Sequence, residues 1–398
     1  MDNIKYLKHI LQKFIKNLDQ KYIVRKRKIY FKDIIYGLSL KTIKSYTYDK
    51  VIYELNKINL SNSLKNNDPI KISKSGFIKK QNLLNTDDIN ILNNSLLKHI
   101  YKDKNEKRIL AVDGSFLKGL KSLNSDGFKF SSKSENYTKS IIGGLYDVNK
   151  KIIINYNHTK SVNERINFKE QLKYVRKGDT ILFDRGYHCN DLVKELNDKK
   201  IKYIFRIKKS YLDCKYLVDN NLKEYIYEKN NYKYKVVNYK INDNGEDYYI
   251  LTNLIYSSID EIKNLYKKRW TIETHYKEAK DTTSLEYLNS KNIDNFTKDI
   301  QMHNFIYILY YAFKNYLKED MSFKNNLNNK LGLEFFIKDI LYILIYKKKL
   351  NNNILNIINI LPITYTHEEE RHFPRISKRK FSKWHYKKDE KNENIKVC

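Results

Sequence analysis

RILAVDGS, at residues 108–115, is a short apolar run that ends in Asp-Gly. Such a run, bounded by turn residues, is typical of a buried β-strand. Two more strand patterns follow closely, SIIGGLYDV at 140–148 and KIIINYNH at 151–158. The next run of this kind, TILFDRGY at 180–187, again contains an Asp that a Gly closely follows. These four runs decide the fold class, because they place a sheet in the middle of the chain.

Helical patterns separate the later strands. Ser161 and Glu164 have the spacing of a capping box and are expected to open a helix that continues through FKEQLKYV (168–175). A second helix, DLVKELNDKK (191–200), and a further strand, KYIFRIKK (202–209), come next. The order of three strands, helix, strand, helix and strand predicts an α/β fold. We expect a mixed sheet flanked by helices, with its first three strands as an antiparallel meander.

Helices are expected on both sides of this region. Residues 31–55 predict two helices joined at Gly37-Leu38-Ser39, either as a helix-turn-helix or as an ordinary helical pair. The later apolar segments FIYILYYAF and FFIKDILYILIY are too short to span a membrane and fit a buried core. The expected organisation is a helical N-terminal region suited to DNA recognition (1–100), the first part of the core (101–210), a β-rich insertion (211–256), a second, helical part (257–362) and a basic C-terminal arm (363–398).

The chain is strongly basic, with 77 Lys and Arg against 46 Asp and Glu and a formal charge of +31. This charge favours an acidic partner such as nucleic acid, or else it is a solvated coat of lysines. The three cysteines show neither metal-ligand spacing nor a disulfide framework. No apolar run reaches the length of a membrane span, and MDNIKYLKHI is not a signal peptide. The expectation is a soluble, intracellular protein.

Two acidic residues stand out because they follow hydrophobic strands. Asp113 and Asp184 are each expected at a strand end, where loops open onto solvent. A single Asp in such a place is usually a turn former or a helix cap. Two of them in one sheet, each followed by a residue that is rare in this chain, indicate a functional site instead.

A third element is the helix around Glu273. Tyr266, Arg269, Glu273 and Lys280 are separated by three, four and seven positions. On one continuous helix these residues fall within roughly a 60° arc, because successive residues turn by about 100°. One face would therefore present a phenol, a guanidinium, a carboxylate and an ammonium group. The alternative is an ordinary ion pair between Arg269 and Glu273 at i,i+4 spacing.

Together these motifs resemble the insertion-sequence-four family of DDE transposases. The resemblance is carried by AVDGS (111–115), FDRGY (183–187) and the Tyr-Arg-Glu-Lys spacing that ends at Lys280. LTNL (251–254), RWTIE (269–273) and PRISKRKFSKW (374–384) also resemble members of that family. The resemblance covers about residues 108 to 385 and leaves residues 1–100 without a match.

The resemblance implies a ribonuclease-H-like core with a β-rich insertion. It implies that Asp113, Asp184 and Glu273 hold two Mg²⁺ ions, for which Mn²⁺ may substitute. Asp113 would bridge both ions. It also implies that Tyr266, Arg269 and Lys280 grip phosphates of the transposon end. The substrate would be double-stranded DNA, cut at paired transposon ends by a homodimer and joined to target DNA.

The C-terminal arm carries two of the scarce arginines, Arg375 and Arg379, just after Pro374. A guanidinium binds phosphate in a bidentate way that lysine does not reproduce. We therefore expect both arginines to contact the DNA backbone, with a mobile charged tail as the alternative. Two other functions stay open: a ribonuclease-H-like nuclease without strand transfer, and an inactive DNA-binding remnant of a transposase.

Overall fold

The computed structural model describes most of the chain and divides it into two compact units, residues 1–363 and 364–398. Of the second unit only Thr364 is described, so the basic arm with Arg375 and Arg379 lies outside the described residues. The described ranges are 2–22, 29–63, 71–131, 134–160, 163–240, 246–321, 326–327, 329–347 and 363–364. The architecture below is that of the first unit.

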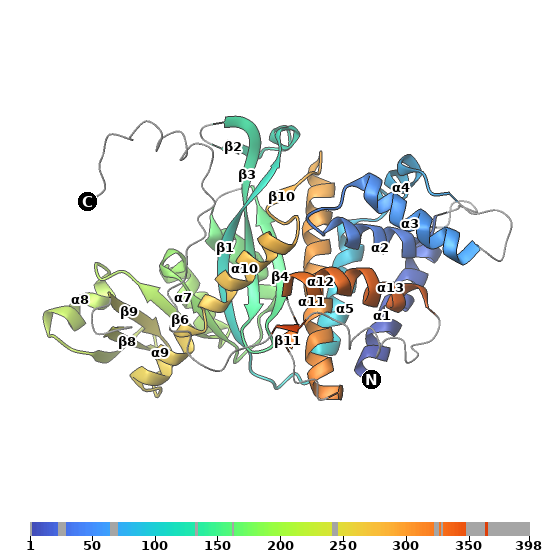
Figure 1. Ribbon diagram of the computed structural model, residues 1–398. Helices are drawn as coiled ribbons and strands as arrows, with labels where there is room; N and C mark the ends of the chain where they lie inside the picture. Colours follow the sequence, from blue (N-terminus) through green and yellow to red (C-terminus); the bar gives the residue numbers. More distant parts are fainter. Residues whose placement is uncertain are drawn as a thin grey trace, which may run out of the picture. The chain divides into compact units, whose positions relative to one another are not determined.

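A ten-stranded mixed sheet forms the centre of this unit (Figure 1). Its order is β2-β3-β1-β5-β6-β9-β8-β7, with β4 paired to β3 and β10 paired to β1. The strands are β1 (Ile109–Leu120), β2 (Lys129–Ser131), β3 (Ser134–Asp147), β4 (Ile152–Thr159), β5 (Thr180–Phe183), β6 (Lys202–Ile207), β7 (Glu224–Lys229), β8 (Tyr232–Lys240), β9 (Asp247–Thr252) and β10 (Tyr287–Leu288). Two short strands, β11 (Asn326–Leu327) and β12 (Ile363–Thr364), lie outside this sheet.

The predicted α/β class and order of elements are confirmed. β1, β3 and β4 form the antiparallel meander, while β5 and β6 run parallel to β1. A long crossover is needed between parallel neighbours. The connection from β1 to its parallel neighbour β5 runs through β2, β3, β4 and α6 (Glu164–Gln171), and the one from β5 to β6 contains α7 (Asn190–Asp198). Short 3₁₀ turns accompany them at Lys121–Asn124, Leu172–Tyr174 and Arg185–Tyr187.

Residues 211–256 contribute α8 (Leu212–Asp219) and the three strands β7, β8 and β9. β9 pairs antiparallel with β6, and β8 and β7 continue outward from it. The β-rich segment therefore extends the central sheet rather than forming a separate one. Four consecutive residues in the middle of β8, Tyr234 to Val237, are buried, so both faces of this strand are covered there.

Two glycines of β3 show which helices cover which face of the sheet. A side chain at Gly143 would meet Asn167 of α6, and one at Gly144 would meet Tyr276 of α10 (Trp270–Thr282). Neighbouring residues of a strand point to opposite faces. Helices α6 and α10 therefore cover opposite faces of the sheet.

The N-terminal region is helical, as expected, but its helices meet elsewhere than predicted. Its elements are α1 (Asp2–Lys21), α2 (Phe31–Lys41), α3 (Tyr48–Ser63), α4 (Lys74–Gln81) and α5 (Thr86–Ile100). Gly37 lies inside α2, not at a junction, and the chain turns at residues 42–47. A Cβ at Gly37 would stand 2.6 Å from the Phe77 ring. Glycine is therefore required here for the close approach of α2 and α4, and not for a turn.

The longest helix, α11 (Ile293–Met321), lies between the N-terminal helices and the central sheet. It packs against α5 on one side and β4 on the other (Figure 1). The segment Phe305–Phe313 is buried on every side, which confirms the expected core helix. The remaining helices are α9 (Ile259–Lys267), α12 (Asn329–Phe335), a π-helical turn (Phe336–Ile340) and α13 (Leu341–Tyr346). Within the described residues, no helix is both long and apolar enough to cross a membrane.

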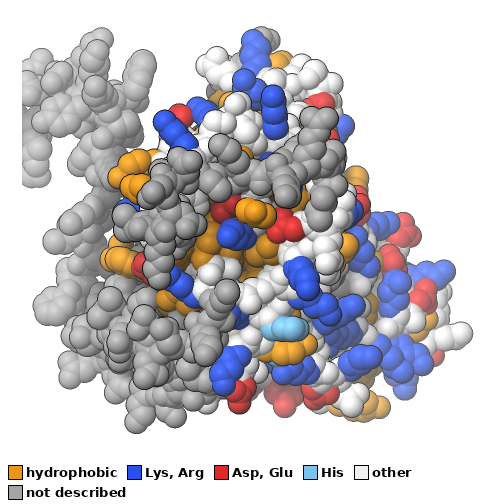
Figure 2. Space-filling view, turned by 90° about the vertical axis from the view of Figure 1, so that its right-hand side faces the viewer, with side chains coloured by type: hydrophobic (Ala, Val, Ile, Leu, Met, Phe, Trp, Pro, Cys, Tyr) orange, Lys and Arg blue, Asp and Glu red, His pale blue; other side chains and the backbone are white. Residues whose placement is uncertain are grey.

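Surface charge on the helical side is dispersed. Figure 2 shows Lys and Arg side chains spread over this face, with acidic and uncharged groups between them. The exposed face of α1 contributes Lys5, Lys13 and Lys16. This distribution fits a lysine coat over the N-terminal helices better than one concentrated binding patch.

Candidate active site

Asp113 lies on β1, and Asp184 directly follows β5, the parallel neighbour of β1. Parallel pairing of β1 with β5 sets Ala111 opposite Leu182. Asp113 comes two residues after Ala111, and Asp184 comes two residues after Leu182, just past the end of β5. Neighbouring strands are about 4.8 Å apart, so the two backbones are close at this point. The sheet thus brings together the two acids that the sequence singled out.

The local settings of the two acids differ from those expected. Asp113 lies within β1, paired to Gly144, rather than at the end of the strand. The strand continues because β3 accompanies it far beyond the end of β5. Asp184 does follow β5 directly and stands at the N-cap of a 3₁₀ turn, but its side chain makes no capping hydrogen bond. The helix-cap alternative therefore does not account for the Asp184 carboxylate.

Helix α10 is fastened over Asp113 by a buried tyrosine. The Tyr276 hydroxyl donates to the backbone carbonyl of Asp113 at 3.0 Å and lies 3.3 Å from that of Ile142. Gly144 leaves the room that this hydroxyl needs, since a Cβ there would stand 2.6 Å from it. The contact fixes the height of α10 above the strand, and with it the position of Glu273 in the first turn of the helix.

The expected single helix from Tyr266 to Lys280 is two helices. Tyr266 belongs to the last turn of α9, Arg269 stands at the N-cap of α10, and Glu273 and Lys280 lie within α10. Tyr266 is 2% exposed and packs with Leu182 and Ile262 in a cluster between α9 and the sheet. This phenol is therefore part of the core in the DNA-free protein.

Arg269 forms the ion pair that was the alternative to a phosphate contact. Its Nη2 donates to Oε1 of Glu273 at 2.7 Å, and the residue is only 4% exposed. The Arg269 Nε and Nη1 are buried and make no hydrogen bond to any described residue. The negative charges of Asp184 and Asp113 also act on Arg269 and help to keep its pKa high against the effect of burial. Arg269 is therefore a buried cation surrounded by carboxylates.

The surroundings of Asp113, which include Glu164, Arg269 and Glu273, disfavour the ionised form of its carboxyl. The pKa of its carboxyl is raised to about 7, chiefly by burial and also by the charges of Glu164 and Glu273, while Arg269 acts in the opposite direction. A carboxyl whose pKa is raised in this way carries a proton over much of the range in which it would otherwise be ionised. The cluster thus holds more negative charge than one arginine balances.

Glu164 is the acid that the sequence analysis missed. It was interpreted as the last residue of a capping box opened by Ser161, which lies outside the described residues. That interpretation is wrong, because α6 begins at Glu164 itself and Asn163 provides the cap by accepting from the Arg165 amide. With Glu164 in the first turn, its side chain is free to face Gly114 and Gly186. The Gly that closely follows each Asp was the one signal available in the sequence.

Lys280 stands in the last turn of α10 and is partly buried. Burial lowers the pKa of its ammonium group, and the like charge of Lys118 adds to this effect while Glu286 opposes it. Lys118 in turn donates to the Tyr287 hydroxyl at 2.6 Å. Two lysines, from β1 and α10, therefore lie near each other, and the ammonium group of Lys118 stands over the aromatic ring of Tyr287.

The donor set suits a hard divalent cation. Carboxylate oxygens are the ligands that Mg²⁺ and Mn²⁺ favour, and the surplus negative charge around Asp113 would be relieved by such an ion. Among the described residues, no three His, Cys, Asp or Glu side chains are grouped closely enough to hold a metal as they stand. One of the three proposed ligands, the Glu273 carboxylate, is ion-paired with Arg269.

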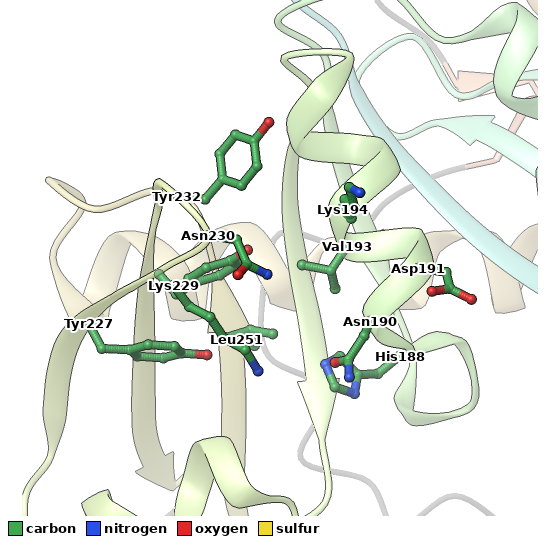
Figure 3. A pocket seen from close by; sticks show the side chains of 11 residues that line it. His188, Asn190, Asp191, Val193, Lys194, Tyr227, Lys229, Asn230, Tyr232 and Leu251 are labelled. Atoms are coloured by element: carbon green, nitrogen blue, oxygen red, sulfur yellow. The ribbon is translucent and has the colours of Figure 1, made fainter.

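A cavity of about 240 Å³ lies between α7 and the β7–β8 hairpin (Figure 3). Its lining includes His188, Lys194, Tyr227 and Tyr234 and does not include Asp113, Asp184 or Glu273. The rings of Tyr227 and Tyr234 are stacked, with centroids 5.2 Å apart. A flat aromatic ligand with a nearby negative charge is the kind of group that this lining can accept.

A mixed sheet of this order, flanked by helices, with Asp113 on β1 and Asp184 directly after β5, is consistent with a ribonuclease-H-like fold. A family model described as a transposase DDE domain matches residues 104–309, which is more than half of the chain. The chain therefore belongs to the transposase DDE domain family. The matched region contains Asp113, Asp184, Glu273 and Lys280.

None of the curated proteins compared matches the chain. Among solved structures, seven chains match, and one of them is the piggyBac transposase in a synaptic complex with hairpin DNA, determined by cryo-electron microscopy. That chain is 14% identical, with 93% of this chain and 86% of that one covered and a TM-score of 0.46. A likeness at this level says nothing about the activity of the present chain.

Proposed function

We propose that this protein is a cut-and-paste DNA transposase that cuts transposon ends and joins their 3′-hydroxyls to target DNA. The proposal is supported by the placement of Asp113 on β1 and of Asp184 directly after the neighbouring parallel strand β5. Glu273 stands in the first turn of α10, which Tyr276 ties to the Asp113 carbonyl. Membership of the transposase DDE domain family gives the reaction class. The finer assignment to the insertion-sequence-four family rests on the Tyr-Arg-Glu-Lys spacing from Tyr266 to Lys280.

Asp113, Asp184 and Glu273 would hold the divalent ions, two Mg²⁺ or two Mn²⁺. Bound ions of this kind supply an activated oxygen nucleophile and neutralise charge on the phosphate and the leaving oxygen. To take part, Glu273 has to exchange Arg269 for an ion. Arg269 then serves two states: it balances the acids before the ions arrive, and its guanidinium becomes available to a phosphate afterwards.

The other residues of the site bind and position the DNA. Lys280 and Lys118 offer ammonium groups to the backbone at the edge of the site, and Tyr287 offers a ring for stacking. Arg375 and Arg379 contact the backbone from the basic arm, within a homodimer that pairs two transposon ends. Residues 211–256 contain no Trp, so Tyr227 or Tyr234 would provide the stacking surface if a base leaves the duplex.

An end-joining assay separates this function from its alternatives. Purified protein is incubated with Mg²⁺ or Mn²⁺, a duplex carrying the inverted repeats that flank its gene, and a supercoiled target plasmid. A transposase cleaves at the repeat and produces joined products that contain the end and the target. Cleavage without joined products would indicate a structure-specific nuclease, and binding without cleavage an inactive remnant. Either result would overturn the proposal.

Lys280 provides a prediction about DNA binding. Replacing Lys280 by glutamine should weaken binding of the end duplex by about 1 kcal/mol and lower the slope of log K against log salt by about one, because one phosphate contact is lost. The comparison is Lys277→Gln, which removes an equal charge from an exposed position of the same helix. Equal salt slopes for the two variants, measured by fluorescence anisotropy, would show that Lys280 belongs to the solvated lysine coat.

A further inference from the structure

Glu164 occupies a space that two glycines leave open. A Cβ at Gly114 would stand 2.5 Å from its Oε1, and a Cβ at Gly186 would stand 3.7 Å from its Oε2. Gly114 directly follows Asp113, and Gly186 comes two residues after Asp184. The carboxylate of Glu164 is therefore placed between the two segments that carry the aspartates.

Glu164 and Glu273 belong to helices on opposite faces of the sheet. Helix α6 covers the face of the sheet opposite to α10, as the contacts of Gly143 and Gly144 show. β5 ends at Phe183, and the next pairing on that edge of β1 is with β10 at Lys118, so the edge of β1 is open between these two points. Glu164 stands at this open end, where a side chain from the α6 face reaches the acids without crossing a paired strand.

A second observation, independent of the acids, indicates a ligand at this place. Tyr187 is fully buried, and its hydroxyl has no hydrogen-bond partner among the described residues. Burial raises the pKa of this phenol, and the charges of Glu164, Asp113 and Asp184 raise it further, in that order of size. The hydroxyl is therefore close enough to Glu164, Asp113 and Asp184 for their charges to act on it. A buried hydroxyl without a partner is costly, which favours a bound group or its water shell there.

Among the described residues no side chain is hydrogen-bonded to Glu164 or forms a close ion pair with it, although the charge of Arg269 acts on its carboxylate. Counted with Asp113, Asp184 and Glu273, it makes four carboxylates around one guanidinium, that of Arg269. A partly buried carboxylate without a partner is expected to acquire one or to become neutral. A divalent cation meets that need and adds no bulk to the space that the glycines leave.

We propose that Glu164 is a fourth carboxylate of the divalent-cation site, acting with Asp113 and Asp184, and that Gly114 lacks a side chain in order to admit it. This inference rests on the proposed function, because the cations are those of the phosphoryl-transfer site. It adds α6, through Glu164, to the elements that would hold the cations. The other acids come from β1, from the segment after β5 and from α10. The competing explanation is that Glu164 only favours the N-terminus of the α6 dipole.

Mn²⁺ binding without DNA tests the assignment, with free Mn²⁺ measured by electron paramagnetic resonance. Glu164→Gln should weaken Mn²⁺ affinity by about tenfold or more. The matched control is Glu170→Gln on the same helix, where the carboxylate accepts from Asn157 instead, and its affinity should equal that of the wild type. Gly114→Ala should reproduce the loss, because its methyl group displaces Glu164, whereas Gly186→Ala should change little at an ordinary contact distance.

A double variant makes the test specific. If Gly114→Ala acts through Glu164, the Gly114→Ala/Glu164→Gln protein should bind Mn²⁺ no more weakly than Glu164→Gln alone. Wild-type affinity in Glu164→Gln, together with lost affinity in Asp113→Asn, would overturn the fourth carboxylate and leave the proposed function standing. Wild-type affinity in both Asp113→Asn and Asp184→Asn would overturn the proposed metal site as a whole. Thermal melting of each variant establishes that it is folded, and Glu164→Gln decides the matter if Gly114→Ala is not.

Discussion

Asp113→Asn is expected to abolish DNA cleavage, lowering its rate by roughly 10³-fold or more, while the end duplex still binds. The amide keeps the size of the side chain and the pairing of β1 with β3, but it removes the charge at the centre of the proposed site. Cleavage is measured on a labelled transposon end with Mg²⁺, and binding is measured on the same duplex with Ca²⁺ in place of Mg²⁺. Cleavage within tenfold of the wild-type rate would exclude Asp113 from the chemistry.

The free energy of unfolding of Asp113→Asn provides a control, because the direction in which it should change can be worked out from the pKa of Asp113. The pKa of Asp113 is raised from 3.8 to about 7 in the folded protein, so the folded state binds the proton more tightly than the unfolded state does. Stability therefore falls as pH rises from about 4 to about 7, and the uncharged amide of the variant would remove this loss. Without metal at pH 8, Asp113→Asn should be more stable than the wild type by on the order of 2 kcal/mol. A less stable variant would indicate that its lost activity reflects misfolding.

Arg269→Ala is expected to destabilise the metal-free protein by about 2–4 kcal/mol, because it leaves several carboxylates around a buried cavity without their cation. Arg269 is 4% exposed and bonded to Glu273, whose own partial exposure to water limits the cost. The loss should grow as pH rises from 6 to 8, since Arg269 holds down the pKa of Asp113. Urea unfolding at several pH values in the presence of a chelator measures the effect.

Adding a divalent ion to the Arg269→Ala variant shows whether Arg269 stabilises the protein through its charge or only through packing. Millimolar Mn²⁺ should restore part of the stability lost in Arg269→Ala, because it replaces the missing positive charge. The matched variant is Lys268→Ala, which removes the neighbouring, exposed charge and should change stability by less than about 0.5 kcal/mol. If Mn²⁺ stabilised Arg269→Ala no more than the wild type, the buried arginine would owe its effect to packing against Tyr266 and Trp270.

Local sequence patterns were sufficient for the elements of the core. The apolar runs around Asp113 and Asp184 predicted buried strands, because a strand inside an α/β fold loses its alternation and becomes continuously apolar. The Glu273 segment was identified by helical spacing, and the all-apolar segment of α11 was recognised as core for the same reason. In each case the signal lies within a few residues and reflects only which side chains avoid water.

The same local reasoning was wrong where a residue served a distant partner. Gly37 was interpreted as a break between helices, whereas it admits the ring of Phe77. Glu164 was assigned to a helix cap, although its neighbours are two glycines that lie 50 and 22 positions away along the chain. Spacing could not decide between a phosphate contact and an ion pair for Arg269, since that choice depends on burial between α10 and the sheet.

The sequence by itself therefore determined the class of fold and the main strands and helices of the core, and it singled out Asp113, Asp184 and Glu273 as the acids to propose for the site. Only the tertiary structure decided that the strands leading to Asp113 and Asp184 are parallel neighbours, that Tyr276 holds α10 over Asp113 and that Glu164 reaches Gly114 from the α6 face. The physical reason is the range of the forces involved. Burial periodicity is set by adjacent residues, whereas the meeting of side chains from different elements is set by how whole strands and helices pack.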